Sequence, residues 1–119
     1  IKNFLSQQVS ALMDGGVQAN RIVLDPGIGF GKTLTQNLSL LQRQSELLTL
    51  GFPVLAGWSR KGSLGKMTAI QGNVPDAQDR VGASVAAALI AVQNGASVVR
   101  VHDVKETVQA LRVWQALKN

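Results

Sequence analysis

The feature that most constrains the fold of this chain is the alternation of short, β-branched apolar segments with longer helical ones. Three segments have the pattern of buried strands: residues 21–25, 53–57 and 96–102. The segments between them have helical periodicity, and the connections are short. Apolar strands separated by helices are typical of a parallel sheet with both faces covered. The sequence therefore predicts an α/β fold.

Helical segments precede, separate and follow these strands. The spacing of apolar residues predicts five helices, over residues 4–13, 34–48, 63–70, 81–93 and 103–117. Gly15, Gly51 and Gly95 follow three of them, as is usual at helix ends. Asp103 and Glu106 have the spacing of a helix N-terminal capping pair, which predicts that the last helix begins at Asp103.

Two architectures agree with this order of elements: a small α/β sandwich of three or four strands, and part of a (β/α)₈ barrel. A complete barrel needs about 250 residues, so residues 1–119, taken as a single segment, supply about half of one. Half a barrel requires a fourth strand between Ile70 and the helix over residues 81–93. We expect that strand to be very short and to lie near residues 80–84.

Composition narrows the classes of function. The net charge is +5, and the twelve Lys and Arg residues are dispersed, whereas a nucleic-acid surface has a basic stripe or arm. A basic pocket for a small phosphorylated or carboxylated ligand fits better, and the alternative is a charge excess that serves solubility. The chain has no cysteine and one histidine, which excludes disulfides, argues against a zinc site and agrees with a cytoplasmic protein. The longest uncharged stretch, residues 81–99, contains several polar residues, so we expect no membrane span.

Polar side chains follow each of the three predicted strands. They are Asp25 after the first, Ser59, Arg60 and Lys61 after the second, and Arg100 and His102 at the end of the third. In parallel α/β folds, the carboxyl ends of the strands and the loops that follow them form the active site. We therefore expect these residues to converge on one ligand site. The alternative is an internal salt bridge from Asp25 to Lys61 or Arg100.

Strand alternation makes this prediction more specific. Arg100 and His102 are two residues apart, so both side chains are expected on one face of the third strand. If the backbone stays extended after the second strand, Ser59 and Lys61 also share a face and Arg60 takes the opposite one.

Glycines alternate with other residues just after Asp25, in the segment Asp-Pro-Gly-Ile-Gly-Phe-Gly-Lys-Thr over residues 25–33. The nucleotide P-loop motif does not fit, because Pro26 stands where its first glycine is required. The dinucleotide motif does not fit either, because Lys32 stands at its third glycine. The segment predicts a loop whose backbone approaches a ligand closely. Phe30 either covers an aromatic ligand or packs on its own helix.

Three motifs occur in a distinctive order: Asp25-Pro-Gly-Ile-Gly-Phe-Gly-Lys32, Ser59-Arg60-Lys61 and Arg100-Val-His102-Asp-Val104. Together they closely resemble the C-terminal half of bacterial dihydropteroate synthase, from about Arg21 to the end of the chain. That family is a (β/α)₈ barrel of folate biosynthesis and the target of sulfonamides. It is a transferase that joins p-aminobenzoate to 6-hydroxymethyl-7,8-dihydropterin pyrophosphate and releases pyrophosphate. The resemblance therefore implies the C-terminal half of a pterin-binding barrel.

The resemblance implies a role for each strand-end residue. Asp25 is expected to accept hydrogen bonds from the pterin amino group and ring N–H, and Lys61 to donate to the pterin carbonyl and a ring nitrogen. Arg100 is expected to lie along the pterin plane and, with His102, to hold the pyrophosphate. Lys61, Arg100 and His102 are thus the expected catalytic residues.

The same resemblance supplies further substrate-binding positions. Ser59 is expected near the carboxylate of p-aminobenzoate, while Gly29 and Phe30 shape the pocket for its ring. Gly57 is expected to bind substrate as well.

The resemblance also implies parts that lie outside these residues. In that family the N-terminal half carries an Asn that binds magnesium and mobile loops that order over the substrates. We therefore expect Mg²⁺ as cofactor, no metal ligand within residues 1–119, no activity from this chain alone and an intact homodimer. Two alternatives stay open: a pterin-dependent methyltransferase, which the Ser-Arg-Lys and Arg-Val-His triplets disfavour, and a non-catalytic pterin-binding fragment.

Overall fold

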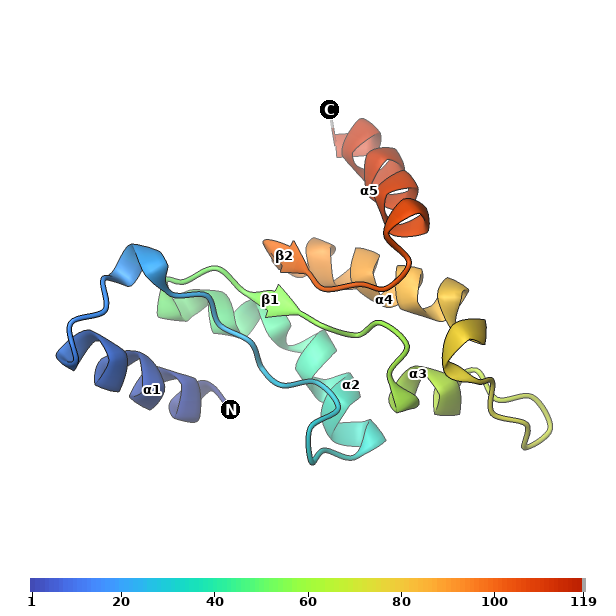
Figure 1. Cartoon of the computed structure of the whole chain (residues 1–119), viewed down its shortest axis with the longest axis horizontal. Helices are drawn as coiled ribbons and strands as arrows, with labels where there is room; N and C mark the ends of the chain where they lie inside the picture. The colour runs from blue at the N-terminus through green and yellow to red at the C-terminus, as the bar shows by residue number, and fades with distance from the viewer. Residues whose placement is uncertain (119) are drawn as a thin grey trace.

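The computed structural model describes residues 1–118 and places three parallel segments side by side in chain order (Figure 1). Leu24 forms a parallel bridge with Val54. Strand β1 (Leu55–Ala56) pairs in parallel with strand β2 (Val98–Val99). The predicted α/β class is confirmed. Because the segments are parallel, their carboxyl ends meet at the same edge.

Helices precede, separate and follow these segments. Within residues 1–118 they are α1 (Lys2–Asp14), α2 (Leu34–Gln42), α3 (Gly62–Met67), α4 (Val81–Gln93) and α5 (Val104–Lys118), with 3₁₀-helices η1 (Ala19–Arg21), η2 (Gln44–Leu50) and η3 (Ala77–Asp79) between them. The helix predicted over residues 81–93 is confirmed at both ends. The helix predicted over residues 63–70 ends earlier, at Met67, because Ile70 bridges to Asn73 in the turn that follows.

The helix predicted over residues 34–48 is broken at Arg43. Beyond this residue the chain tightens into η2, in which side chains at positions i and i+3 lie in line. Gln44 and Leu47 are therefore both buried. Burial brings the Gln44 amide to the Ala91 carbonyl on α4, at 2.9 Å.

The predicted strands are longer than the observed ladders. Residues 21–25 contribute one bridge, because η1 occupies the start of the segment. The bonds of that bridge run from the Leu24 N–H to the Pro53 carbonyl, at 2.8 Å, and from the Leu55 N–H to the Leu24 carbonyl, at 2.7 Å. β-branched residues favour extended backbone, but a ladder forms only where two extended segments lie in register.

The fourth strand predicted near residues 80–84 is wrong. Helix α4 begins there, and the Ser84 N–H donates to the Arg80 carbonyl at 2.8 Å, as in a first helical turn. The alanines that follow Ser84 favour helix over strand. Strands β1 and β2 are direct neighbours, so the chain between them is one long crossover through α3, η3 and α4. The chain supplies three β/α units and a preceding helix.

Two hydrophobic clusters pack the helices against the parallel segments. One comprises Leu5, Val9, Ile22, Leu24, Leu47 and Val54 and holds α1; the other comprises Ile28, Leu41, Ala56, Trp58, Leu64, Ala87, Ala91 and Ala96. The alanines of α4 allow it to lie close to the strands. Trp58 is 2% exposed and directly precedes the Ser-Arg-Lys motif, so that motif rests on the core.

The elements form an open layer with extents of 50 × 37 × 21 Å, in which α5 projects above α4 and packs on it (Figure 1). Among residues 1–118, no helix combines the length and apolar character that crossing a membrane requires.

Candidate functional site

A turn directly after β1 carries the Ser-Arg-Lys motif. Its hydrogen bond runs from the Lys61 N–H to the Trp58 carbonyl at 3.1 Å. Arg60 has a φ of 58°, in the left-handed region that residues other than glycine seldom occupy. The backbone is therefore not extended here, so the condition under which Ser59 and Lys61 would share a face is not met. The turn sets where these side chains point.

Ser59 lies buried beside the end of the third parallel segment. Its hydroxyl oxygen accepts a hydrogen bond from the His102 N–H at 3.1 Å. The same oxygen lies 2.9 Å from His102 Nδ1. The fold therefore joins two predicted site residues that are 43 positions apart.

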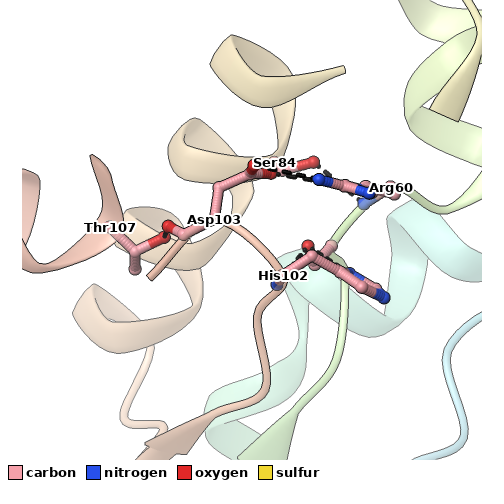
Figure 2. A network of polar contacts seen from close by, with 6 residues as sticks. Arg60, Ser84, His102, Asp103 and Thr107 are labelled. Carbon is pink, nitrogen blue, oxygen red and sulfur yellow. Dashed lines mark hydrogen bonds and ion pairs between the residues drawn. The ribbon is translucent and has the colours of Figure 1, made fainter. Parts of the chain in front are cut away.

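Arg60 pairs with the next residue of that segment, Asp103 (Figure 2). Its Nη2 lies 3.1 Å from Asp103 Oδ1, and its Nε lies 3.4 Å from Oδ2. The Arg60 N–H donates to the Ser84 hydroxyl at 2.9 Å, and its carbonyl accepts from Arg80 at 2.8 Å. Helix α5 begins at Val104, directly after Asp103, as predicted. Within residues 1–118 the Asp103 carboxylate bonds to Arg60 and no hydrogen bond joins it to Glu106, so the predicted capping pair does not form.

Arg100 lies against the backbone at Gly57, directly after β1. A β-carbon at Gly57 would lie 3.3 Å from Arg100 Nη2 and 3.4 Å from Nε. The absence of a side chain at this buried position therefore lets the guanidinium approach the strand. Arg100 itself is exposed, which leaves its donors available to a ligand.

Lys61 reaches across to the glycine-rich loop. Its Nζ lies 4.4 Å from the centre of the Phe30 ring, within range of a cation–π interaction. A β-carbon on Gly29 would lie 3.1 Å from Lys61 Cδ. Gly29 has a φ of 84°, so both its conformation and the passage of Lys61 favour glycine there.

Asp25 opens the loop and is exposed. Its Oδ1 accepts a hydrogen bond from the Gly27 N–H at 2.8 Å, which fixes the turn. The ion pairs found within residues 1–118 are Arg43–Glu46 and Arg60–Asp103. The alternative of an internal salt bridge from Asp25 to Lys61 or Arg100 is therefore wrong.

Asn37 is a positioning residue that was not predicted from the sequence. It is 1% exposed, its Oδ1 accepts from the Gly29 N–H at 3.0 Å, and its Nδ2 donates to the Ser63 hydroxyl at 2.8 Å. It thus ties the glycine-rich loop to α3. The available signal was an amide at position 37 within the apolar stripe that contains Leu34 and Leu41.

A cavity of about 600 Å³ lies between the start of α1 and α2 and touches the glycine-rich loop at Phe30. Its rim includes Arg43 and Glu46, which form an exposed ion pair of 2.6 Å. The hydrogen bond from Arg43 lowers the pKa of Glu46 below its usual value. We call Asp25, Phe30, Lys61, Arg100 and His102 the strand-end group. Lys61, Arg100 and His102 are not among the residues that line the cavity, so the cavity is separate from this group and meets it only at Phe30.

The strand-end group is suited to an anionic, planar ligand. It presents two cationic side chains and an imidazole beside an aromatic ring and a carboxylate. Among residues 1–118 there is no cluster of three or more His, Asp and Glu side chains that could hold a metal ion. The predicted magnesium ligand concerns residues outside this chain and stays a prediction.

Comparison with known proteins agrees with this arrangement. Residues 1–102 match the family model described as pterin binding enzyme. Dihydropteroate synthase from Neisseria meningitidis serogroup B is 44% identical over 120 residues, which cover 98% of this chain and 41% of that protein. The chain therefore spans about two fifths of the length of the curated relatives it matches.

Solved structures give the same result for the fold. Dihydropteroate synthase from Stenotrophomonas maltophilia, with imidazole bound in its active site, has a TM-score of 0.93 and 49% identity, covering 98% of this chain and 43% of that one. The enzyme from Xanthomonas albilineans, in complex with 7,8-dihydropteroate, has a TM-score of 0.93 and 45% identity over the same shares. These relatives are (β/α)₈ barrels, so the three β/α units described above are part of an α/β barrel. With a family model that covers most of its length, the chain belongs to the pterin binding enzyme family.

Proposed function

We propose that a complete barrel containing residues 1–119, in which this chain is the C-terminal part, is a dihydropteroate synthase. It condenses p-aminobenzoate with 6-hydroxymethyl-7,8-dihydropterin pyrophosphate and releases pyrophosphate. The observation that carries the proposal is the convergence of three motifs at one edge: the Asp25 loop, the Lys61 turn and the Arg100–His102 segment. Relatives of that name and the dihydropteroate complex of the Xanthomonas albilineans enzyme support it.

Asp25 and Lys61 recognise the pterin ring in this proposal. The Asp25 carboxylate accepts from the pterin amino group and the adjacent ring N–H, a planar donor pair that suits two carboxylate oxygens. Lys61, held beside Gly29 and over Phe30, donates to the pterin carbonyl and a ring nitrogen. Gly29 and Phe30 border the space for the p-aminobenzoate ring.

Arg100 and His102 hold the pyrophosphate. The amine of p-aminobenzoate attacks the methylene carbon of the pterin, the bond from that carbon to the pyrophosphate oxygen breaks, and the amine loses a proton. Negative charge accumulates on the leaving pyrophosphate, where the Arg100 guanidinium and a His102 ring donor stabilise it. Gly57 leaves room for Arg100 beside β1.

Magnesium, a homodimeric state, sensitivity to sulfonamides and a cytoplasmic location complete the proposal and rest on the family resemblance. When bound, magnesium would neutralise pyrophosphate charge. The residues of this chain act on the organic part of the substrate and on the phosphates beside it.

A turnover assay on the complete barrel tests the proposed function. With both substrates present, we expect pyrophosphate release that depends on p-aminobenzoate and is inhibited by a sulfonamide. Turnover of a methylated folate instead would identify a methyltransferase, and pterin binding without turnover would identify a non-catalytic binder. Residues 1–119 alone are expected to be inactive in the same assay.

A further inference from the structure

The Ser59 hydroxyl forms its hydrogen bonds with a single residue. It is 6% exposed, and both of its contacts within residues 1–118 go to His102, one to the backbone N–H and one to Nδ1. A serine hydroxyl has one donor and two acceptor sites. One acceptor site is filled by the backbone N–H of His102. It remains to be assigned whether the hydroxyl or Nδ1 donates in the second hydrogen bond.

The direction of the hydrogen bond between Ser59 and Nδ1 follows from the need to give the buried hydroxyl hydrogen an acceptor. If Nδ1 donated to Ser59, the buried hydroxyl hydrogen would have no acceptor among the described residues, and buried donors rarely lack one. If the hydroxyl donates to Nδ1 instead, every group is satisfied. The neutral ring then carries its hydrogen on Nε2, which is left to face a ligand from the exposed His102 side chain.

A second pair of contacts fixes the two backbones that this bond joins (Figure 2). Arg60 pairs with Asp103, so consecutive residues of the turn bind consecutive residues of the third segment. The Arg60 N–H is held in addition by Ser84 on α4. The 59–102 contact is therefore set by three elements rather than by the turn alone.

We infer that Ser59 is a positioning residue that holds the His102 imidazole as an Nε2–H donor for the phosphate oxygens, and that its hydroxyl does not bind p-aminobenzoate. The kinetic part of this inference rests on the proposed function. The tautomer of His102 is a property of the fold alone.

The test compares Ser59→Ala with Ser59→Thr, which keeps the hydroxyl, in the complete barrel. Ser59→Ala should raise the KM for the dihydropterin pyrophosphate and the inhibition constant of pyrophosphate about two- to tenfold, the effect of one hydrogen bond. The KM for p-aminobenzoate and the affinity for a pterin without phosphates should stay unchanged. Ser59→Thr should restore the wild-type constants, and Ser45→Ala, the same change at an exposed serine, should leave all of them unchanged.

Nitrogen-15 NMR of the histidine ring supplies a readout that does not depend on turnover. The signals of neutral His102, identified by their loss in His102→Gln, should show hydrogen on Nε2 in the wild type and a mixture of tautomers in Ser59→Ala. If Ser59→Ala does not fold, Ser59→Cys keeps a weak donor and a weak acceptor at the same position and so weakens the same contacts, with the same expected pattern.

Two results would overturn the inference: a KM for p-aminobenzoate that rises while pyrophosphate inhibition is unchanged, or a wild-type ring protonated on Nδ1. Failure of the proposed function is distinct from both, because it is a wild-type protein that lacks turnover, in which the tautomer can still be measured.

Discussion

The glycine-rich loop over residues 25–33 and the pair of segments over residues 57–61 and 100–103 form one candidate site but are held in different ways. The loop is held mainly by its own residues: Asp25 accepts from the Gly27 N–H, and Lys32 donates to the carbonyls of Gly27 and Phe30, at 2.7 and 3.1 Å. The other two segments are held by bonds between residues 20 to 43 positions apart.

The difference implies that the conformations of the two regions depend on different parts of the chain. The loop depends mainly on its own sequence and on one link to the packed layer through Asn37, and three positive-φ glycines let its backbone turn repeatedly. A turn bonded to distant segments depends on the whole packed layer. We therefore expect substitutions in the second region to disturb both stability and ligand binding, and substitutions in the first to act locally.

The largest effect should come from Asn37, the buried link between the loop and α3. Asn37→Leu leaves the Gly29 N–H and the Ser63 hydroxyl without their partner. An unsatisfied buried group costs about 1–3 kcal/mol. The contact to Ser63 is buried and the contact to Gly29 is partly buried, so the free energy of unfolding should fall by about 2–4 kcal/mol. Urea unfolding of the complete barrel measures this, with the exposed Gln42→Leu on the same helix as control. Equal losses in the two variants would mean that the loop holds itself without Asn37.

The second largest effect should come from the ion pair of the long-range region. The Arg60 and Asp103 side chains are 32% and 15% exposed, so Asp103→Asn should lower the free energy of unfolding by about 1–3 kcal/mol. Pyrophosphate inhibition should weaken in the same variant, because the 59–102 contact loses its neighbour. Glu106→Gln makes the same chemical change on an exposed residue of α5 and should affect neither property. An Asp103→Asn protein that loses stability but binds pyrophosphate normally would separate the two effects and contradict the account.

Substitutions at Gly29 and Gly31 separate the effect of a positive φ from the effect of a contact with Lys61. Gly29 and Gly31 have φ values of 84° and 64°, so alanine at either should cost about 1–2 kcal/mol of stability. Only at Gly29 would the new β-carbon press on Lys61, at 3.1 Å; at Gly31 it would meet nothing within 4 Å. Calorimetry should therefore show pterin affinity about fivefold weaker in Gly29→Ala, equivalent to about 1 kcal/mol, and unchanged in Gly31→Ala. The same affinity loss in both variants would exclude Lys61 as the cause.

The smallest effect should come from the exposed pair Arg43–Glu46, whose side chains are 69% and 51% exposed. The hydrogen bond from Arg43 lowers the pKa of Glu46 from its usual 4.5. The stabilisation is therefore present above that value and is lost as the pH falls through the lowered pKa. Glu46→Gln should change urea unfolding little at neutral pH, and less still at high salt. A loss as large as that of Asp103→Asn would show that exposure does not separate the two ion pairs.

Features set by local sequence could be predicted, whereas features set by contacts between distant residues could not. The bounds of α4 were predictable because an alanine-rich run ends at Asn94-Gly95, and local propensity decides both. The break at Arg43 was not, because it depends on a bond from Gln44 to the distant Ala91 carbonyl. Ladder length and the direct pairing of β1 with β2 depend likewise on which segments lie side by side.

The candidate site was predictable as a set of residues but not as a set of contacts. Asp25, Lys61 and His102 were identified because each follows an apolar segment. The pairing of Ser59 with His102 and of Arg60 with Asp103 requires the turn at Arg60. This turn could not be predicted, because its positive φ occurs at an arginine and not at a glycine or asparagine. Asn37 was missed because an amide in a leucine stripe is a weak signal.

The most direct test of the account is a crystal structure of the complete barrel with 6-hydroxymethyl-7,8-dihydropterin pyrophosphate. We expect the pterin ring between Asp25 and Lys61, with the phosphate oxygens at the Arg100 guanidinium and His102 Nε2. A pterin bound in the cavity between α1 and α2, or phosphates that contact neither Arg100 nor His102, would contradict it.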